Sequence, residues 1–590
     1  MDQRRLFLAI AVSLAILLGF QWLIAPHLPK PAPVPAQQHV ATAEHPVTTP
    51  SQGGPAATVA NGAEPGAVAA AKSNPVPKNV PRVEISAPRV EGSISLLGAR
   101  LDDIVLRDYR EDLAPNSPLV RLLEPRSGDH PYYVQYGWTA GKGEAVKLPD
   151  NDTIWTASEK TLAPGKPVTL SWDNGEGLTF QIGLQIDDEY MFTVSQTVRN
   201  ATGKPVSLFP WARVRRDYTP ETAGYYILFE GLLGVADGTL HNTSYSSAKS
   251  EGEKHNGIAF DETTTGGWAG FTDKYWLTAI VPNQGVPSKV NFRHIDDNGD
   301  HYQVDYITAD PLVAPANGDI SSVSHVFAGA KVASILSNYE SSLHIPLFDY
   351  AVDWGWFWFL TRPIFLAIDW LNGLIGNFGL AIMAFTVFVK ALFFPLANYS
   401  YRSMSKMKLL GPRMTALRER LKDDPQKMQQ EMMSLYKQEG VNPASGCLPM
   451  IVQIPVFFSL YKVIYVTIEM RQAPFFGWIH DLSLVDPTNV FNLFGLLPFD
   501  PTQISPLLHM GAWPLIMGLT MYAQQKMNPP PPDPVQAKLF QFMPVIFTFM
   551  MAKFPAGLII YWSWNNTLSV LQQWLIQRRT RLAKPSLART

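Results

Sequence analysis

The chain has 590 residues, of which 46 % are hydrophobic, and its formal net charge at pH 7 is −2. This charge argues against a dedicated nucleic-acid-binding protein, which would usually be strongly basic. Cys447 is the only cysteine, so the sequence excludes an internal disulfide and makes a cysteine-ligated metal site unexpected. Long apolar runs occur at residues 6–25 and after residue 355, whereas the chain between them is polar and rich in turn residues.

Residues 1–25 are predicted to form an N-terminal transmembrane anchor. Residues 6–25, LFLAIAVSLAILLGFQWLIA, are uncharged and follow Arg4 and Arg5. A helix of this length spans the hydrocarbon core, which is about 30 Å thick. The alternative is a cleaved signal peptide, but the apolar run is longer than usual for one and no small-x-small cleavage site precedes Pro26. The basic start places the N-terminus in the cytoplasm.

The middle of the chain is predicted to hold a linker and then a β domain. Residues 26–84 are rich in Pro, Ala, Thr and Gln without apolar periodicity, which predicts a disordered linker. Over residues 85–340 apolar and polar side chains alternate with a period of two, as in FQIGLQI at 180–186. Residues 290–292 are expected to pair with residues 302–306 across a DNGD turn. The pattern predicts an all-β sandwich, which lies outside the cytoplasm because it follows the anchor.

The C-terminal part of the chain is predicted to lie on or in the membrane. Residues 350–376 contain four tryptophans together with Arg362, Pro363 and Asp369, which predicts an amphipathic helix at the membrane surface. Residues 377–577 are predicted to form a five-helix core with a cytoplasmic helical hairpin at 401–440. The five predicted spans of the core are 378–398, 447–468, 507–526, 538–553 and 556–577.

The charges of the loops predict the topology. The hairpin 401–440 carries nine Lys or Arg residues and the basic tail 578–590 carries five, whereas the loop 471–506 has Arg471 alone. Cytoplasmic loops are enriched in Lys and Arg. The anchor and the five core spans make six spans. With both termini in the cytoplasm, the hairpin and the tail lie inside and the loop 471–506 lies outside, as these Lys and Arg counts require.

Lys390 is the main candidate for a functional residue within the spans. An ionisable side chain near the middle of a span costs about 2.5–3.5 kcal/mol on insertion scales, and its default interpretation is functional. The alternative is that Lys390 extends to the cytoplasmic face, about eight residues away. Thr386 lies one turn earlier on the same face. Since no Asp or Glu within the predicted spans pairs with Lys390, an ion-coupled transporter is disfavoured.

Polar side chains in other spans are expected to line a recess together with Lys390. Each alone would be explained by a hydrogen bond between helices, worth about 1 kcal/mol. Together they predict a polar recess on the cytoplasmic side of the bundle, which would favour acidic or polar segments of a bound protein. The candidate recess residues are Lys390, Thr386, Gln453, Ser563, Asn565 and Asn566.

The hairpin 401–440 has an apolar face rich in methionine. Its apolar residues recur at spacings of three and four, which is typical of one face of a helix. Asp424 followed by Pro425 predicts a helix N-cap with proline at the first position. Two compatible interpretations stay open: packing of the two helices on each other, and a face that receives a partner. The residues assigned to this surface are Met404, Met407, Leu410, Met414, Leu417, Arg418, Asp424, Met428 and Met432.

Enzyme motifs are absent from the sequence. It contains no Walker A loop, no HExxH, no G-x-S-x-G and no metal-ligand cluster, so we expect no enzymatic activity, no cofactor and no metal. His480 and Asp481, beside Trp478, predict a loop anchored at the membrane interface rather than a catalytic pair. Without a nucleotide site, the protein is expected to act through binding and partitioning.

Several segments after residue 355 resemble a known family. VNPASGCLPMIVQIPVFFSLY, RQAPFFGWIHDLS, FMPVIFTFM and FPAGLIIYW closely resemble the YidC-type membrane protein insertases of the YidC/Oxa/Alb family, and the hairpin matches that family's first cytoplasmic loop. The anchor and the β domain resemble the Gram-negative form. The resemblance implies a polytopic α-helical protein of the bacterial inner membrane, with six transmembrane helices, five of them forming the insertase core, plus an all-β periplasmic supersandwich domain.

The resemblance also implies a groove that is open to the cytoplasm and to lipid but closed outside. Lys390 stands where well-known members carry arginine, and lysine lacks the fork of donors that binds a carboxylate through two hydrogen bonds. Thr386 matches a groove-lining threonine. A second departure is an insert at 491–506. The residues implied to contact the transmembrane segment of a client, the protein being inserted, are Ile454, Phe457, Tyr561 and Trp562, the last two where the family has tyrosines.

Together these features predict an insertase and chaperone that acts alone or with the Sec translocon. Implied partners are nascent membrane proteins, the Sec translocon, the ribosome, the signal recognition particle machinery and membrane lipids. The basic tail suits ribosomal RNA and anionic lipid equally. The alternatives are a small-solute transporter or channel, which would show paired intramembrane charges or repeats, and a glycan-binding or envelope-structural module on a membrane stalk.

Overall fold

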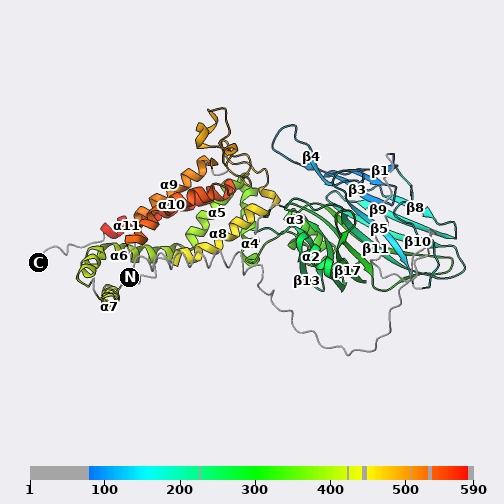
Figure 1. The fold of residues 1–590 in the computed structure, drawn as a ribbon, viewed down its shortest axis with the longest axis horizontal. Coiled ribbons are helices and arrows are strands. Elements are labelled where there is room, and N and C mark those ends of the chain that lie inside the picture. Colours follow the sequence, from blue (N-terminus) through cyan, green and yellow to red (C-terminus); the bar gives the residue numbers. More distant parts are fainter. Residues whose placement is uncertain are drawn as a thin grey trace, which may run out of the picture. The chain divides into compact units, whose positions relative to one another are not determined.

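The computed structural model describes residues 79–582, except for residues 142, 223, 225–226, 422–423, 441–447, 506–507 and 529–533. The predicted anchor 1–25, nearly all of the predicted linker and most of the basic tail lie outside the described residues, as does Cys447. The described chain consists of a β-rich part followed by a helical part (Figure 1). Both of these parts were predicted.

Two large sheets build the β-rich part. The first contains eleven strands, in the order β14-β17-β18-β11-β5-β3-β2-β1-β7, with β19 paired to β11 and β4 paired to β3. The second contains nine, in the order β13-β12-β15-β16-β20-β10-β9-β8-β6. The strands of the first sheet are β1 Arg82–Ser86, β2 Val90–Ser95, β3 Arg100–Arg110, β4 Leu119–Leu123, β5 Tyr132–Ala140, β7 Thr161–Leu162, β11 Val206–Arg216, β14 Ile258–Thr265, β17 Pro287–Asp296, β18 Asp300–Thr308 and β19 Leu312–Ala314.

The second sheet and one helix complete this part. Its strands are β6 Thr156–Ala157, β8 Val168–Asp173, β9 Leu178–Ile186, β10 Met191–Asn200, β12 Gly231–Ala236, β13 Thr239–Thr243, β15 Trp268–Thr272, β16 Trp276–Val281 and β20 Gly318–Ala330. Helix α2, Tyr245–Lys254, follows β13 and is capped at its N-terminus by the Ser244 side chain.

Alternating side chains form the core between the two sheets. In β9 the residues Phe180 and Ile182 are buried, whereas their neighbours Gln181 and Gly183 are partly exposed. The two inner faces meet through aromatic contacts: Trp138 of β5 packs edge-on against Phe180 at 5.1 Å between ring centroids. A period of two therefore sorts side chains between core and solvent, as expected for stacked sheets.

The predicted hairpin between residues 290 and 306 is confirmed. Strands β17 and β18 pair with Phe292 opposite Val304, and the strands end at the pair Asp296 and Asp300. Asn298 adopts a positive φ of 59°, a conformation that asparagine and glycine tolerate better than other residues. The local sequence was enough to set this register.

The helical part runs from α3 to α11. Its helices are α3 Ala333–Ser342, α4 Trp358–Ile375, α5 Phe378–Leu392, α6 Phe394–Arg420, α7 Pro425–Gln438, α8 Leu448–Val466, α9 Ala512–Met527, α10 Pro534–Met551 and α11 Ala556–Leu582. The 3₁₀ turns that the structure describes in full between them are η3 Phe348–Ala351, η5 Ile468–Met470, η6 Val490–Gly495 and η7 Pro501–Gln503.

Within the described residues, no single helix is long and apolar enough to cross a membrane alone. The pair α5 and α6 passes by length and composition together, but it is bent by 68°. The predicted span 378–398 is therefore two helices, because Pro395 in the first turn of α6 cannot donate a hydrogen bond back to α5. The other helices lie close to the predicted spans, and the number of six spans stays a prediction.

Two segments differ from a plain helical bundle. Helix α4 ends at Gly376, whose φ of 74° is left-handed, and Trp356 before this helix is 92 % exposed. The insert at 491–506 forms η6 and η7, and it exposes apolar side chains such as Leu496, which is 81 % exposed.

We predict that the β domain depends on the small size of Gly329 in β20. A Cβ at this position would lie 2.2 Å from the ring of Tyr190, which is fully buried. Gly329→Ala is expected to lower the free energy of unfolding by about 1–3 kcal/mol, because the ring has to move within a filled core. Thermal unfolding of the full chain in detergent, followed by near-ultraviolet circular dichroism, measures the change.

Gly203→Ala is the matched control, since nothing lies within 4 Å of a Cβ added there. Equal midpoints for the two variants would contradict the packing argument.

Candidate functional site: a polar recess around Lys390

Lys390 lies in the last turn of α5 and points at α11. Its Nζ donates a hydrogen bond of 2.8 Å to Ser569 Oγ, and Ser569 in turn donates to the carbonyl oxygen of Asn565 at 2.8 Å. Across the described ranges, no carboxylate lies within ion-pair distance of Lys390. Its charge is therefore held by a neutral hydroxyl and not by an acid.

A small cavity of about 30 Å³ lies beside Lys390. This volume has room for about one water molecule. Gln453 of α8 reaches the same cavity, and its Nε2 donates to the hydroxyl of Tyr561 at 2.6 Å. The cavity is lined by Val389, Lys390, Phe393, Leu396, Ala397, Tyr401, Gln453 and Val456. Helices α5, α6 and α8 therefore meet at this point, with α11 behind Lys390.

Helix α11 supplies a column of polar side chains. Asn565 is 9 % exposed, and its Oδ1 has no hydrogen-bond partner in the part of the chain that the structure describes. Asn566 donates to Thr520 Oγ1 at 3.3 Å, and Ser563 donates to the carbonyl of Ile559, one turn earlier, at 2.8 Å. Of these predicted residues, Asn565 is connected to Lys390: its backbone carbonyl accepts the hydrogen bond from Ser569, which in turn accepts one from Lys390.

Thr386 is placed differently from Lys390 although both belong to α5. It is 2 % exposed, and its hydroxyl donates to the carbonyl of Ile382 at 2.7 Å. A hydroxyl that bonds to its own helix has its donor occupied. Thr386 is also not among the residues that line the cavity at Lys390.

Sequence reasoning missed four polar residues of this region. Ser569 binds Lys390, Tyr401 lines the cavity, and Gln572 and Gln573 continue the polar column at 9 % and 1 % exposure. Ser569 follows Asn566 at a spacing of three, and Gln572 and Gln573 follow Ser569 at spacings of three and four, the repeat of one helix face. That repeat was available in the sequence and would have found three of the four.

The residues expected to contact the apolar segment of a client divide into two groups. Phe457 of α8 packs edge-on against Trp562 at 4.6 Å between ring centroids. Ile454, one turn earlier on α8, is 51 % exposed. Tyr561 is 2 % exposed, and its hydroxyl faces Gln453. Ile454, Phe457 and Trp562 thus form an aromatic and aliphatic surface, whereas Tyr561 belongs to the polar side.

The hairpin consists of α6 and α7 packed on each other. The predicted N-cap is confirmed: the Asp424 side chain accepts a hydrogen bond from the backbone N–H of Lys427 at 3.1 Å. The Tyr436 hydroxyl contacts Met414 Sδ at 3.5 Å, and Leu410 is 6 % exposed. The other residues assigned to this surface are half-buried: Met404, Met407, Met414, Leu417, Arg418, Met428 and Met432.

A second cation of the helical core, Lys462 of α8, was not predicted. Its Nζ pairs with Asp353 Oδ2 at 2.6 Å and also donates to the carbonyl oxygen of Ile227 in the β-rich part. Asp353 accepts a further hydrogen bond from the backbone N–H of Phe229 at 3.0 Å. Lys462 therefore joins α8, the segment before α4 and the loop before β12 at one point.

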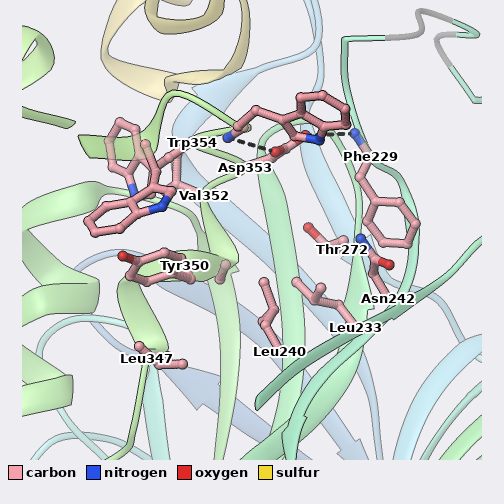
Figure 2. Close-up of a pocket in the computed structure, with 14 residues that line it drawn as sticks. Phe229, Leu233, Leu240, Asn242, Thr272, Leu347, Tyr350, Val352, Asp353 and Trp354 are labelled. Atoms are coloured by element: carbon pink, nitrogen blue, oxygen red, sulfur yellow. Dashed lines mark hydrogen bonds between the residues drawn. The ribbon is translucent and has the colours of Figure 1, made fainter. Parts of the chain in front are cut away.

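An apolar cavity of about 340 Å³ lies next to this ion pair. Figure 2 shows Asp353 and Phe229 above the side chains of Leu233 and Leu240. Other contacts hold the same region together: Arg362 pairs with Asp349 at 2.7 Å, and Glu469 accepts from the first N–H of α3, that of Ala333, at 3.0 Å.

Lys331, at the end of β20, is a further buried cation near this junction. Its Nζ donates to Thr272 Oγ1 at 2.9 Å, and its side chain is almost fully buried. Burial lowers the pKa of Lys331 to about 8, although the negative charge of Asp353 opposes the shift. Over the described ranges, no group of three or more His, Cys, Asp or Glu residues is arranged to hold a metal ion.

The fold and the recess define an apolar helical core with a lysine between its helices, joined to a large β domain. Residues 370–584 match the family model described as 60Kd inner membrane protein, and residues 82–367 match that of the YidC periplasmic domain. The class is therefore a bacterial inner membrane protein with a periplasmic β domain.

Relatives identify the family. A membrane protein insertase YidC of Granulibacter bethesdensis is 62 % identical over 590 residues, which is 100 % of both chains. One of Acidiphilium cryptum is 54 % identical over 86 % of both chains. A crystal structure of an active YidC insertase is 17 % identical, covers 84 % of this chain and 92 % of its own, and has a TM-score of 0.34, too low to support a conclusion. The chain belongs to the YidC family of membrane protein insertases, and the resemblance found in the sequence is confirmed.

We predict that the Lys462–Asp353 pair fixes the segment before α4 on the core. Lys462→Met leaves Asp353 without its cation, and the free energy of unfolding is expected to fall by about 2–3 kcal/mol because Asp353 stays largely shielded from water. Adding Asp353→Asn is expected to recover part of this loss, since no unpaired charge then remains. Thermal unfolding of the full chain in detergent measures both variants.

Lys408→Met on the exposed surface of α6 is the control and is expected to leave the midpoint unchanged. A Lys462→Met variant as stable as the parent chain would show that the pair does not hold this segment.

Proposed function

We propose that this chain inserts proteins into the inner membrane by receiving the polar end of a client in the recess around Lys390. The single observation that carries the proposal is the hydrogen bond from Lys390 Nζ to Ser569 Oγ at 2.8 Å, in a site without a carboxylate partner among the described residues. A cation held only by a hydroxyl keeps most of its field for an incoming negative or polar group. A cation already paired with a carboxylate, such as Lys462, does not.

The size of the cavity implies that the recess opens when a client enters. At about 30 Å³ it holds roughly one water, whereas a short polar tail needs far more space. Phe393 between α5 and α6, Tyr401 of α6 and Val456 of α8 line it, next to the 68° bend between α5 and α6. We infer that α5 and α6 move apart at this bend. A bent pair of helices with a proline in the first turn of the second has fewer hydrogen bonds to break than a continuous helix.

The apolar part of the client follows a different route. Ile454 is 51 % exposed and lies on α8 near the edge-on pair of Phe457 and Trp562. Transfer of an apolar helix into lipid is favourable by about 25 cal/mol per Å² of surface removed from water. This term supplies the driving force without a nucleotide, and the recess lowers the barrier for the polar end that must cross.

The proposal also includes the topology of the chain and its partners at the membrane. Both termini lie in the cytoplasm and the β domain in the periplasm, in keeping with the charges of the loops. The hairpin of α6 and α7 presents exposed basic residues on the cytoplasmic side, where the ribosome, the signal recognition particle machinery and anionic lipids offer negative charge. The Sec translocon is a further partner for clients with large external domains.

A solute transporter is the second candidate, and the geometry favours it less. Such a site would pair the intramembrane cation with an acid that takes part in coupling. Lys390 has a serine in that position, and the Lys462–Asp353 pair ties the core to the β domain instead.

We predict that insertion depends on the charge of Lys390. Lys390→Ala removes the cation, and insertion of a small single-span client with an acidic tail is expected to fall about tenfold, which corresponds to the loss of one hydrogen bond to a charged group. Lys390→Arg keeps the charge and is expected to retain most of the activity. The measurement is protease protection of the client after its synthesis with liposomes that contain the purified chain.

Lys538→Ala, which removes an exposed cation from α10, is the matched control and is expected to insert the client as the parent chain does. Full protection of the client by Lys390→Ala would remove the charge from the mechanism. If liposomes with the parent chain protected the client no better than empty liposomes, the protein would be a chaperone that requires the translocon and not an autonomous insertase.

We predict that the β domain is not the main purpose of the protein. Deletion of residues 85–330 is expected to leave most of the insertion activity, because the recess is built from α5, α6, α8 and α11 alone. The same liposome assay measures it, with the amount of folded chain checked by its resistance to protease. Complete loss of insertion by a folded, membrane-bound deletion variant would favour the view that the β domain carries the function.

A further inference from the structure

A polar cavity of about 290 Å³ lies in the β domain, on the first sheet and distant in sequence from the recess. Its walls come from β1, β2, the start of β3 and the loop after β4. The residues that matter for its charge are Arg82, Arg100, Asp102, Asp103, Arg126 and Ser127.

Arg100 is the unusual member of this group. It is 2 % exposed, and its two terminal nitrogens donate to the backbone carbonyls of Leu97 at 3.0 Å and Asn151 at 2.8 Å. Its Nε has no hydrogen-bond partner, and no carboxylate lies within ion-pair distance among the described residues. A buried guanidinium usually has an anionic partner, because removal of its charge from water costs several kcal/mol.

The acids of the cavity are already engaged by other groups. Asp102 pairs with Arg82. Asp103 pairs with Arg121 at 2.8 Å and accepts from the Ser93 hydroxyl at 2.9 Å. The two acids thus pair with two other arginines, and Arg100 and Arg126 have no carboxylate within ion-pair distance in the described part of the chain.

The pKa of Arg100 agrees with the absence of a carboxylate partner. Burial lowers the pKa of Arg100 to about 10; the positive charges of Arg126 and Arg213 act in the same direction, and Tyr133 and Asp102 oppose the shift. An anion placed between Arg100 and Arg126 would relieve both the burial cost and the repulsion.

We propose that this cavity is a binding site for a phosphate group, held by the guanidinium groups of Arg100 and Arg126. Guanidinium groups match the geometry of phosphate oxygens, and the hydroxyl of Ser127 at the rim supplies a third donor. A volume of about 290 Å³ exceeds the need of inorganic phosphate and approaches the ~300 Å³ typical of small-molecule sites. The ligand is therefore a phosphate monoester or diester with a small attached group, and a lipid headgroup and a soluble phosphate ester share this chemistry.

Arg126→Gln is the variant that tests the site. Arg126 is half-buried and has no ion pair in the described chain, so its replacement is expected to leave the fold intact. Replacement of Arg100 also removes a hydrogen bond to Leu97 in the turn between β2 and β3 and one to Asn151 in the loop after β5. Arg199→Gln is the matched control: Arg199 lies on β10, its side chain is 60 % exposed, and it pairs loosely with Asp319 at 3.8 Å.

The full chain in a non-ionic detergent is titrated with inorganic phosphate, with glycerol phosphate and with a short-chain phosphatidic acid, each against chloride at equal ionic strength. Binding is followed by isothermal titration calorimetry and by the thermal unfolding midpoint. We expect a saturable, one-to-one interaction for at least one phosphate ligand, with the midpoint rising as the ligand concentration increases. Arg126→Gln is expected to weaken the affinity about tenfold, and Arg199→Gln is expected to leave it unchanged.

The three ligands separate the sources. Binding of glycerol phosphate together with phosphatidic acid supports the site with phosphate itself as the recognised group. Binding of phosphatidic acid alone supports it with a lipid headgroup as the ligand. The absence of saturable binding for all three ligands, or an equal loss in Arg126→Gln and Arg199→Gln, would overturn the proposal.

Discussion

A cation removed from water needs a partner, and the partners of Lys462, Lys390 and Arg100 separate these three buried cations by role. Lys462 has a carboxylate at 2.6 Å and two segments that converge on it, so it fastens the β-rich part to α8. Lys390 has a serine hydroxyl at 2.8 Å and a cavity beside it, so its charge is still available. Arg100 has backbone carbonyls as partners, and its Nε has none among the residues that the structure describes. Of these three cations, the one paired with a carboxylate joins two parts of the chain, and the other two line cavities.

The same constraint organises the junction between the two parts of the chain. Asp353 lies in the segment that leads into α4 and pairs with Lys462 of α8, and Arg362 of α4 pairs with Asp349 of η3. Glu469, just after α8, accepts from the first N–H of α3 and so satisfies one of the donors that every helix leaves free at its start. Several such contacts at one place restrict how α4 and α8 move relative to the last strands. Movement during insertion is then expected nearer the bend between α5 and α6.

Features set by neighbouring residues were predictable from the sequence, and features set by distant residues were not. The hairpin of β17 and β18 and the N-cap at Asp424 follow from a turn sequence and from one polar residue before a proline. The pair of Lys462 and Asp353 joins residues 109 positions apart, and no local pattern marks it. Lys462 also stood in an apolar run with tyrosines on both sides, where a single charge did not disturb the pattern of a span.

The recess was predictable in part for the same reason. Lys390, Gln453 and Asn565 are polar groups in apolar helices, so their type alone indicated a polar site. Their partners depend on which turn of α11 faces α5, and that follows from packing. Thr386 shows that residues on the same face of a helix need not share a site. It lies four residues from Lys390, yet its hydroxyl donates to the carbonyl of Ile382. Tyr401 lines the cavity beside Lys390, and Ser569 binds Lys390.

The lysine at position 390 fits the recess that surrounds it. The groups within reach are one hydroxyl and a cavity for about one water, which suit a compact ammonium with three donors. An arginine has five donors in a rigid fork and would need acceptors on two sides, such as the unpartnered Oδ1 of Asn565. A lysine also approaches a client group as a point charge without a required orientation. Under the proposed function, the recess would recognise negative charge and polarity more than the planar shape of a carboxylate, which would suit a protein whose clients differ in sequence.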